Sequence, residues 1–209
     1  VTITAAGTYL VKGSAPDATL TIDAAKTDKI QLVFDGVSIS CTDGPAVYIK
    51  CADKVFITLA DGSENFLSDG DSYEIVDNGS TLDAALFSKE DLTINGSGSL
   101  TVNGNYKHGI VSKDDLVITG GIITITSVKA GIDGKDCVKI GGGTIRITAG
   151  SDGIRSSNDE DTSRGYIYIS GGTIDITAGN DGIQAETVLN ITGGEFTIES
   201  GGGSANAST

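Results

Sequence analysis

The sequence predicts an all-β protein, built as a parallel β-helix in which coils of three short strands stack on one another. Three observations lead to this fold. The composition is rich in glycine and β-branched residues, a unit of about 22 residues recurs, and apolar residues fall at equivalent positions of each unit.

The composition favours short strands and tight turns over helices. The chain has 209 residues, of which 38% are apolar, and it contains 30 glycines, two prolines, and no Trp or Met. Abundant Thr, Ile and Val are typical of strands, and glycine is typical of turns. We expect a single domain over residues 1–209, with the most regular coils in 85–203 and a polar tail in 204–209.

The second half of the chain contains four copies of the repeated unit, at 109–130, 131–152, 153–181 and 182–203. The third copy is longer because it carries the polar segment "SSNDEDTSRG", as expected for an insertion that bulges from a coil as a loop. Residues 85–108 form a looser copy, and residues 46–59 a more distant one.

Within each copy, apolar and polar residues alternate in short runs separated by glycine-rich corners, so one face of each strand should be buried. Aligned copies give columns that stay apolar. The columns are Leu86, Ile110, Ile132, Ile154 and Ile183; Leu92, Leu116, Val138, Ile167 and Leu189; and Leu100, Ile123, Ile145, Ile174 and Phe196. A β-sandwich is the alternative fold, but its turns should vary, whereas these recur at one period.

The formal net charge of -14 disfavours binding to nucleic acid and to anionic membranes, because both need a basic surface. Cations are the expected companions. No run of about 18 apolar residues predicts membrane insertion. The first residues, "VTITAAGTYL", lack the features of a secretion signal, so we expect any leader to be absent from this chain.

The three cysteines have neither metal-binding nor disulfide-scaffold spacing. Cys41 aligns with Ser127 and Ala149, and Cys51 with Ser88, so both columns demand small side chains. We expect reduced, buried thiols, with a Cys41–Cys51 bridge as the alternative.

An acidic turn recurs in successive copies, as "AGSDGIRSS" and "AGNDGIQAE". If the copies stack, Asp152 and Asp181 lie about 4.8 Å apart, and their repulsion calls for a cation, a base or a raised pKa. Oxygen ligands suit Ca²⁺. The candidate calcium ligands are Asp152, Asp181, Asn180, Asp133, Asp136, Asn158, Asp159, Asp161 and Glu186. The alternative is a solvated acidic edge that caps turns.

A row of lysines is the candidate polysaccharide-binding surface. "SKED", "SKDD" and "GKDC" place Lys89, Lys113 and Lys135 in one row, each beside an acid. Regularly spaced ammonium groups can meet the carboxylates or hydroxyls of a polymer, although a charge-compensated ladder is the alternative. Residues that border the same turn and extend this patch are Lys107, His108 and Arg155.

No catalytic site is expected. Hydrolysis of a glycosidic bond needs carboxylates that face one bond, and elimination needs a base opposite a metal. Asp114 and Asp115 are adjacent in sequence and need not share a target. A polysaccharide lyase or glycoside hydrolase remains the rival function.

Several segments resemble a known family, among them "IQLVFDGVSIS", "ADGSENFLSDG", "AALFSKEDLTINGSGSLTVNG", "HGIVSKDDLVITGG" and "DGIQAETVLNITGG". These segments are similar to the carbohydrate-binding parallel β-helix family typified by a clostridial cellulose- and acid-sugar-binding protein. The similarity spans nearly the whole chain. The turn "AGID" at 130–133 departs from the Asp-Gly-Ile turn of later copies.

This resemblance implies a right-handed, single-stranded parallel β-helix like that of pectate lyases. It also implies non-catalytic binding of polygalacturonate, other pectin or cellulose, outside the cell or at its surface, with calcium as a structural ligand. We therefore expect a plant cell-wall polysaccharide as the partner, with calcium stabilising acidic corners. A structural surface adhesin or spacer is a third possible role.

Overall fold

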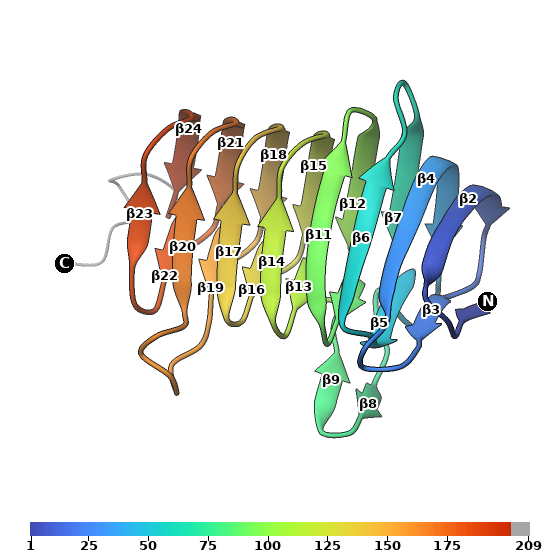
Figure 1. Ribbon diagram of the computed structural model, residues 1–209. Coiled ribbons are helices and arrows are strands. Elements are labelled where there is room, and N and C mark those ends of the chain that lie inside the picture. The colour runs from blue at the N-terminus through green and yellow to red at the C-terminus, as the bar shows by residue number, and fades with distance from the viewer. Residues whose placement is uncertain (202–209) are drawn as a thin grey trace.

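The computed structural model describes residues 1–201, so the polar tail predicted for 204–209 lies outside that range. Within residues 1–201 the chain forms strands and no helix. Two long sheets of parallel strands run along the molecule, and a small antiparallel hairpin projects from one side (Figure 1). An all-β fold was predicted, and it is confirmed.

The regular coils each contain three strands, and each strand pairs in parallel with its equivalent in the next coil. Their bounds are β10 Ala84–Ser88, β11 Asp91–Gly96 and β12 Ser99–Gly104; β13 His108–Ser112, β14 Asp115–Ile118 and β15 Ile122–Ser127; β16 Ile132–Gly134, β17 Cys137–Ile140 and β18 Thr144–Ala149; β19 Ile154–Ser156, β20 Tyr166–Ile169 and β21 Thr173–Ala178; β22 Ile183–Ala185, β23 Leu189–Ile191 and β24 Glu195–Ser200.

The N-terminal coils are less regular. Their strands are β1 Thr2–Ile3, β2 Gly7–Ala15, β3 Leu20–Asp23, β4 Lys29–Ser40, β5 Val47–Cys51, β6 Lys54–Leu59 and β7 Glu64–Ser68. The long strand β4 bends around a corner, pairing with β6 through its first half and with β7 near its end. We call the outer surface of β6, β11, β14, β17, β20 and β23, which faces the viewer in Figure 1, the front face.

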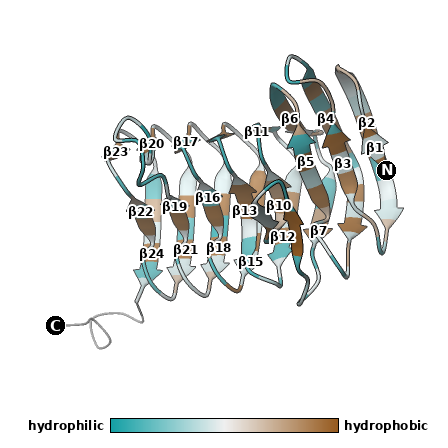
Figure 2. Cartoon of the chain, turned by 90° about the horizontal axis from the view of Figure 1, so that it is seen from below, coloured by the Kyte–Doolittle hydropathy of each residue, from teal (hydrophilic) through white to brown (hydrophobic). Residues whose placement is uncertain are grey.

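The strand register confirms the predicted columns. Ile110 pairs with Ile132, which pairs with Ile154, and all three are fully buried. Hydrophobic positions repeat from coil to coil along β13, β16, β19 and β22 (Figure 2). Most of the buried apolar residues form one continuous cluster along the coils. This arrangement is consistent with a parallel β-helix, and its right-handed sense stays a prediction.

Two segments leave the coil. The predicted loop lies between β19 and β20, where the polar insertion falls. The hairpin of β8 (Ile75–Asp77) and β9 (Ser80–Leu82) was not predicted. Asn78 and Gly79 connect its strands with φ values of 47° and 80°, the left-handed conformation of a tight hairpin turn. Leu82 of the hairpin packs with Tyr48, Phe87 and Val111, a second apolar cluster outside the main core.

The cysteines are free, as expected. Cys41 and Cys137 are buried, whereas Cys51 is only half-buried. The predicted column of Cys51 is wrong, because Ser88 pairs with Ile49, two residues earlier. Cys51 pairs instead with Asp23 after a shift in register. No helix in residues 1–201 has the length and apolar character needed to cross a membrane.

Candidate functional site

The acidic turns of successive coils do stack. Because Ile154 pairs with Ile183, Asp152 and Asp181 occupy equivalent positions, and the amide of Gly153 donates to the Asp181 carbonyl at 2.8 Å. Their surroundings differ, since Asp152 is buried and Asp181 is exposed. The Asp181 amide donates to Oδ1 of Asp152 at 3.3 Å. The carboxylate of Asp152 therefore caps the next turn.

Arg155 is the counter-ion of Asp133 and Asp152 at this corner. Its Nε and Nη2 donate to Oδ2 of Asp133 at 2.9 and 2.6 Å, and its Nη1 lies 3.8 Å from Oδ2 of Asp152. Ser157 donates to the other oxygen of Asp133 at 2.9 Å. The sequence predicts Arg155 in a sugar-binding patch and Asp133 in a calcium site. The structure instead joins them as an ion pair.

The remaining candidate calcium ligands mostly build the inserted loop. Nδ2 of Asn158 donates to Oδ1 of Asp136 at 2.7 Å, and Oδ1 of Asn158 accepts from the amide of Asp161 at 3.0 Å. Arg164 contacts the other oxygen of Asp136. Exposed positions hold Asp159, Asn180, Asp181 and Glu186. In residues 1–201, the groups of acids close enough to share one ion lie elsewhere, so the predicted set is not one cluster.

The predicted lysine row is in register, but its ammonium groups have partners within the protein. Nζ of Lys89 donates to the Asp77 carbonyl of the hairpin at 2.9 Å. Nζ of Lys135 lies 3.5 Å from Glu160 in the inserted loop. Lys113 places its ammonium over the ring of Phe87, 5.4 Å from the centroid. Lys89 and Lys135 therefore pair with acids of the hairpin and the inserted loop, whereas the charge-compensated alternative pairs each lysine with the acid beside it in sequence.

Lys107 and His108 have local partners as well. Lys107 Nζ lies 3.7 Å from Asp83 and 4.7 Å from the centre of the Tyr106 ring. Nδ1 of the buried His108 accepts from the Ala130 amide at 3.2 Å, which ties two coils together. Burial lowers the pKa of His108, so the ring is neutral at pH 7. This geometry gives His108 a structural role.

A different acidic site lies along the edge of the front face. It is a groove of about 560 Å³. We call it the acidic groove, and its charged lining residues are Lys26, Asp53, Glu90, Asp91, Asp114, Asp115, Asp136 and Arg164. The corners that precede β11, β14 and β17, together with the first residues of β11 and β14, supply five of the six carboxylates. Stacking of the coils turns an acid repeated in sequence into a continuous row.

Most carboxylates in the acidic groove have a cationic partner. Lys26 Nζ lies 2.5 Å from Glu90, Lys54 Nζ 2.9 Å from Asp91, and Lys139 Nζ 3.1 Å from Asp115, while Arg164 contacts Asp136. In residues 1–201, no salt bridge reaches Asp114, although it lies among these acids. The groove therefore lacks one cation at Asp114.

The electrostatics of Asp114 reflect this missing charge. Partial burial, a hydrogen bond with Asp136 and the negative charge of Asp91, Asp136 and Asp115 raise the pKa of Asp114 to about 6. Oxygen atoms of Asp91, Asp114 and Asp115 lie within 4.8 Å of one another, close enough to hold one metal ion. Like charges brought this close favour either a bound proton or a bound cation.

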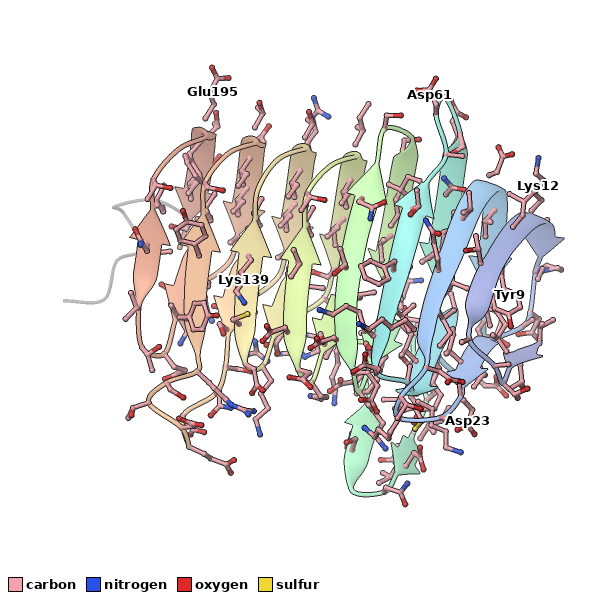
Figure 3. The ribbon with its side chains drawn as sticks, in the orientation of Figure 1. Tyr9, Lys12, Asp23, Asp61, Lys139 and Glu195 are labelled. Carbon is pink, nitrogen blue, oxygen red and sulfur yellow. The ribbon has the colours of Figure 1, made fainter. Side chains whose placement is uncertain are left out.

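Asp115 and Lys139 link the acidic groove to the front face. Lys139 projects from the middle of β17 toward the viewer (Figure 3). Although burial opposes it, hydrogen bonds to Tyr166 and Asp115 raise the pKa of Lys139. Burial likewise acts against the ionised form of Asp115, but the Cys137 thiol and Lys139 lower the pKa of this carboxyl. Lys139 is thus a fully charged ammonium group at neutral pH.

The candidate calcium ligands predicted from the sequence do not include Asp91, Asp114 or Asp115, because adjacent acids need not share a target. Lys113 and Asp114 form the corner between β13 and β14, where the alternation of strand side chains stops. Asp114 and Asp115 can therefore approach the same point. The available signal was the repeated pair of acids before a leucine in "KEDL" and "KDDL".

A second group of possible metal ligands comprises Asp17, Cys41 and Asp43. Oδ1 of Asp17 already accepts hydrogen bonds from the amide and hydroxyl of Thr42, at 3.0 and 2.8 Å. A hydrogen bond of 3.5 Å joins the Cys41 thiol to Asp43. Because a thiol suits soft metals better than hard ones, this group fits calcium less well than the acidic groove.

Comparison with known proteins identifies relatives of this chain. A relative from Acetivibrio thermocellus, described as a carbohydrate-binding domain-containing protein, is 44% identical over 126 residues, or 60% of this chain. That match spans only 44% of the relative's own length. A solved structure described as the polysaccharide lyase-like protein from C. thermocellum, gadolinium derivative, is similar with a TM-score of 0.85 and 39% identity. The similarity covers 93% of this chain and 89% of that one.

A family model described as carbohydrate-binding domain-containing protein matches residues 1–209. This match extends beyond the region shared with the relative from A. thermocellus and includes every coil described above. The chain therefore belongs to the carbohydrate-binding domain-containing protein family.

Proposed function

We propose that this protein binds acidic plant cell-wall polysaccharide, such as polygalacturonate, along its front face without cleaving it. We further propose that Ca²⁺ occupies the acidic groove and bridges protein and polymer. One observation carries this proposal. In residues 1–201 no salt bridge reaches Asp114, whereas the carboxylates around it each pair with a lysine or an arginine. Because pectin lies outside cells, the protein would act outside the cell or at its surface.

The acidic groove suits calcium in its chemistry. Ca²⁺ takes about six to eight oxygen ligands in a flexible shell. Asp91, Asp114 and Asp115 would supply part of that shell, and water or the carboxylates of a polyuronide could complete it. The gadolinium used for the solved relative is also a hard cation that prefers oxygen. The residues that line the groove include neither a cysteine nor a histidine, which softer metals prefer.

The spacing of the coils supports a polymer as the ligand. Equivalent residues of neighbouring strands lie about 4.8 Å apart, which is comparable to the length of one pyranose residue. Asp91 and Asp115 precede equivalent residues of adjacent coils, since Leu92 pairs with Leu116. Successive sugars could therefore meet successive coils. The row of Lys89, Lys113 and Lys135 supports the proposal less well, because its ammonium groups have internal partners.

The state of Lys139 supports binding over catalysis. Elimination from a uronate needs a base that can accept a proton beside the metal. The Lys139 ammonium already donates to Asp115 at 3.1 Å, so it is placed to act as a hydrogen-bond donor to a carboxylate. A polysaccharide lyase is the second candidate function, favoured by the description of the solved relative as polysaccharide lyase-like.

Affinity electrophoresis through polygalacturonate, with either calcium or a chelator in the gel, tests the proposal. We expect retardation with calcium, little retardation with chelator, and little in a neutral galactan gel. Asp114→Asn should move like the chelated protein, and Asp133→Asn, at the corner neutralised by Arg155, should move like the wild type. Equal mobility in all gels would contradict the proposal.

A parallel incubation separates the two candidate functions. Wild-type protein, calcium and polygalacturonate are followed by the ultraviolet absorbance of unsaturated sugars. Constant absorbance and constant polymer length are expected, whereas new unsaturated ends would identify a lyase. The same electrophoresis through cellulose derivatives determines whether cellulose is a further ligand.

A further inference from the structure

A second groove lies beside the acidic groove, toward the C-terminal end of the front face. It has a volume of about 280 Å³ and is formed by β17, β20, the segment that leads into β23, and the inserted loop. We call it the tyrosine groove, and its polar or aromatic lining residues are Lys139, Ser163, Tyr166, Tyr168, Thr187 and Asn190. The strand register places Lys139 beside Tyr168, and Tyr168 beside Asn190, on consecutive coils.

Tyr168 presents its ring to solvent. It is 37% exposed, and it is the only aromatic residue among the large apolar side chains exposed in residues 1–201. The hydroxyl of Thr192 donates to its phenolic oxygen at 3.3 Å. Tyr166, two residues earlier on β20, is less exposed than Tyr168. Val188, which is also exposed, lines the same groove, so the ring belongs to a small apolar patch.

Lys139 gives the tyrosine groove its charge. Its ammonium lies 5.4 Å from the centre of the Tyr166 ring and 3.1 Å from the carboxylate of Asp115. One cation therefore lies between an aromatic wall and the acidic groove. An ammonium beside an aromatic face fits a ligand that has both a carboxylate and an apolar ring surface.

A uronate sugar has these two features. One face of a pyranose ring presents C–H groups that pack on an aromatic ring, and the carboxylate projects from its edge. The hydroxyls of the sugar can pair with Thr187 and Asn190 at the far wall. The volume of the groove is near the lower end of the range for ligand pockets, which suits one sugar residue.

The two grooves are adjacent and share part of their lining. Ser163 and Tyr166 line both of them, and the inserted loop forms a shared wall. Contacts with Asp136 anchor this loop, including the 2.7 Å hydrogen bond from the Gly165 amide to its carbonyl. The hydroxyl of Thr187 donates to the Arg164 carbonyl at 2.6 Å, so the loop is also tied to the next coil. A polymer that leaves the acidic groove would therefore enter the tyrosine groove.

We propose that the tyrosine groove is a subsite for one uronate residue, with Tyr168 packing against the sugar ring and Lys139 pairing with its carboxylate. This inference rests on the proposed function, since it assigns one sugar of the same polymer to named residues. Recognition in this subsite is direct and needs no metal. Stacking sets the preference for a pyranose, and Lys139 sets the preference for an acidic one.

Calorimetric titration with trigalacturonate and with its carboxyl-reduced neutral counterpart, at a fixed calcium concentration, tests the subsite. Tyr168→Ala should weaken binding of both sugars about fivefold, whereas Tyr168→Trp should retain it. Lys139→Gln should weaken only the binding of trigalacturonate, by about fivefold. Leu10→Ala and Lys12→Met are matched controls, exposed and distant on β2, and should bind like wild type.

The outcomes separate this inference from the proposed function. Wild-type protein that binds trigalacturonate, with Tyr168→Ala and Lys139→Gln binding equally well, would overturn the subsite alone. Wild-type protein that binds neither sugar would overturn both. Because the chain has no Trp, the fluorescence of Tyr168→Trp gives an independent signal at the ring itself, and no change on saturation with trigalacturonate would also contradict the subsite.

Discussion

The corner around Asp133 and the acidic groove contain similar residues but differ in how their acids are paired. At the corner, Arg155 contacts Asp133 and lies close to Asp152, so these two buried acids share an internal counter-ion, whereas Asp181 is exposed. In the acidic groove, the lysines near Asp114 pair with other carboxylates: Lys54 with Asp91, and Lys139 with Asp115. The number of acids in a segment therefore does not identify a metal site. The acidic groove differs in that Asp114, which no salt bridge reaches in residues 1–201, lies with Asp91 and Asp115 close enough to share one ion.

The inserted loop between β19 and β20 contributes to this pairing. The inserted loop supplies Arg164 to Asp136 and Ser157 to Asp133, so it provides partners for acids of the preceding coil. No insertion follows β13 or β10, and the acids there depend on lysines of neighbouring strands. Asp114 lies at the boundary between these two arrangements.

The largest effect is expected from removing the acids of the groove. Replacing Asp91, Asp114 and Asp115 with Asn should weaken calcium binding by at least about 100-fold, since even indirect partners of metal ligands contribute about 10- to 100-fold. Isothermal titration calorimetry measures this loss. Asp133→Asn combined with Asp152→Asn is the matched control, and a comparable loss in that variant would place the ion at the corner instead.

Removal of Arg155 should have its main effect on folding. Arg155→Met leaves the buried Asp133 without its cation, which we expect to destabilise the protein by about 3 kcal/mol. Thermal unfolding measures the change, and Asp133→Asn in the same chain should restore part of the stability. Unchanged stability together with lost sugar binding would instead make Arg155 a ligand-binding residue.

Calcium binding should weaken as the pH falls through about 6. Asp114 must lose its proton to bind the ion, and its pKa is raised to about 6, so a fall from pH 7 to pH 5 should weaken binding about tenfold. Titrations at several pH values measure this dependence. A profile flat down to pH 5 would show that the ion does not compete with a proton on Asp114.

The smallest effect concerns the stability of the calcium-free protein. Since the pKa of Asp114 is raised, its protonated form stabilises the fold below pH 4, and this contribution is lost as the pH rises through about 6. Asp114→Asn removes the repulsion, so at pH 8 it should stabilise the protein slightly, by under about 1 kcal/mol after solvent screening. Thermal unfolding with chelator measures it, and a destabilised variant would contradict the account.

The sequence predicts the coils well because a column such as Ile110, Ile132 and Ile154 depends only on the repeat. It predicts the sites poorly because a corner breaks the alternation of side chains, as at Asp114. Ion pairs such as Arg155–Asp133 also require knowing which side chain reaches across a coil. The hairpin at Asn78 and Gly79 could have been predicted, since Asn-Gly between β-forming residues is typical of such turns.

Anomalous diffraction from a crystal soaked in Tb³⁺, a hard cation that substitutes for calcium, tests the central claim most directly. The account predicts a peak among the carboxylates of Asp91, Asp114 and Asp115, displaced when calcium is added in excess. A peak at Asp133, Asp152 and Asp181 instead, or the lack of any peak in the acidic groove, would contradict it.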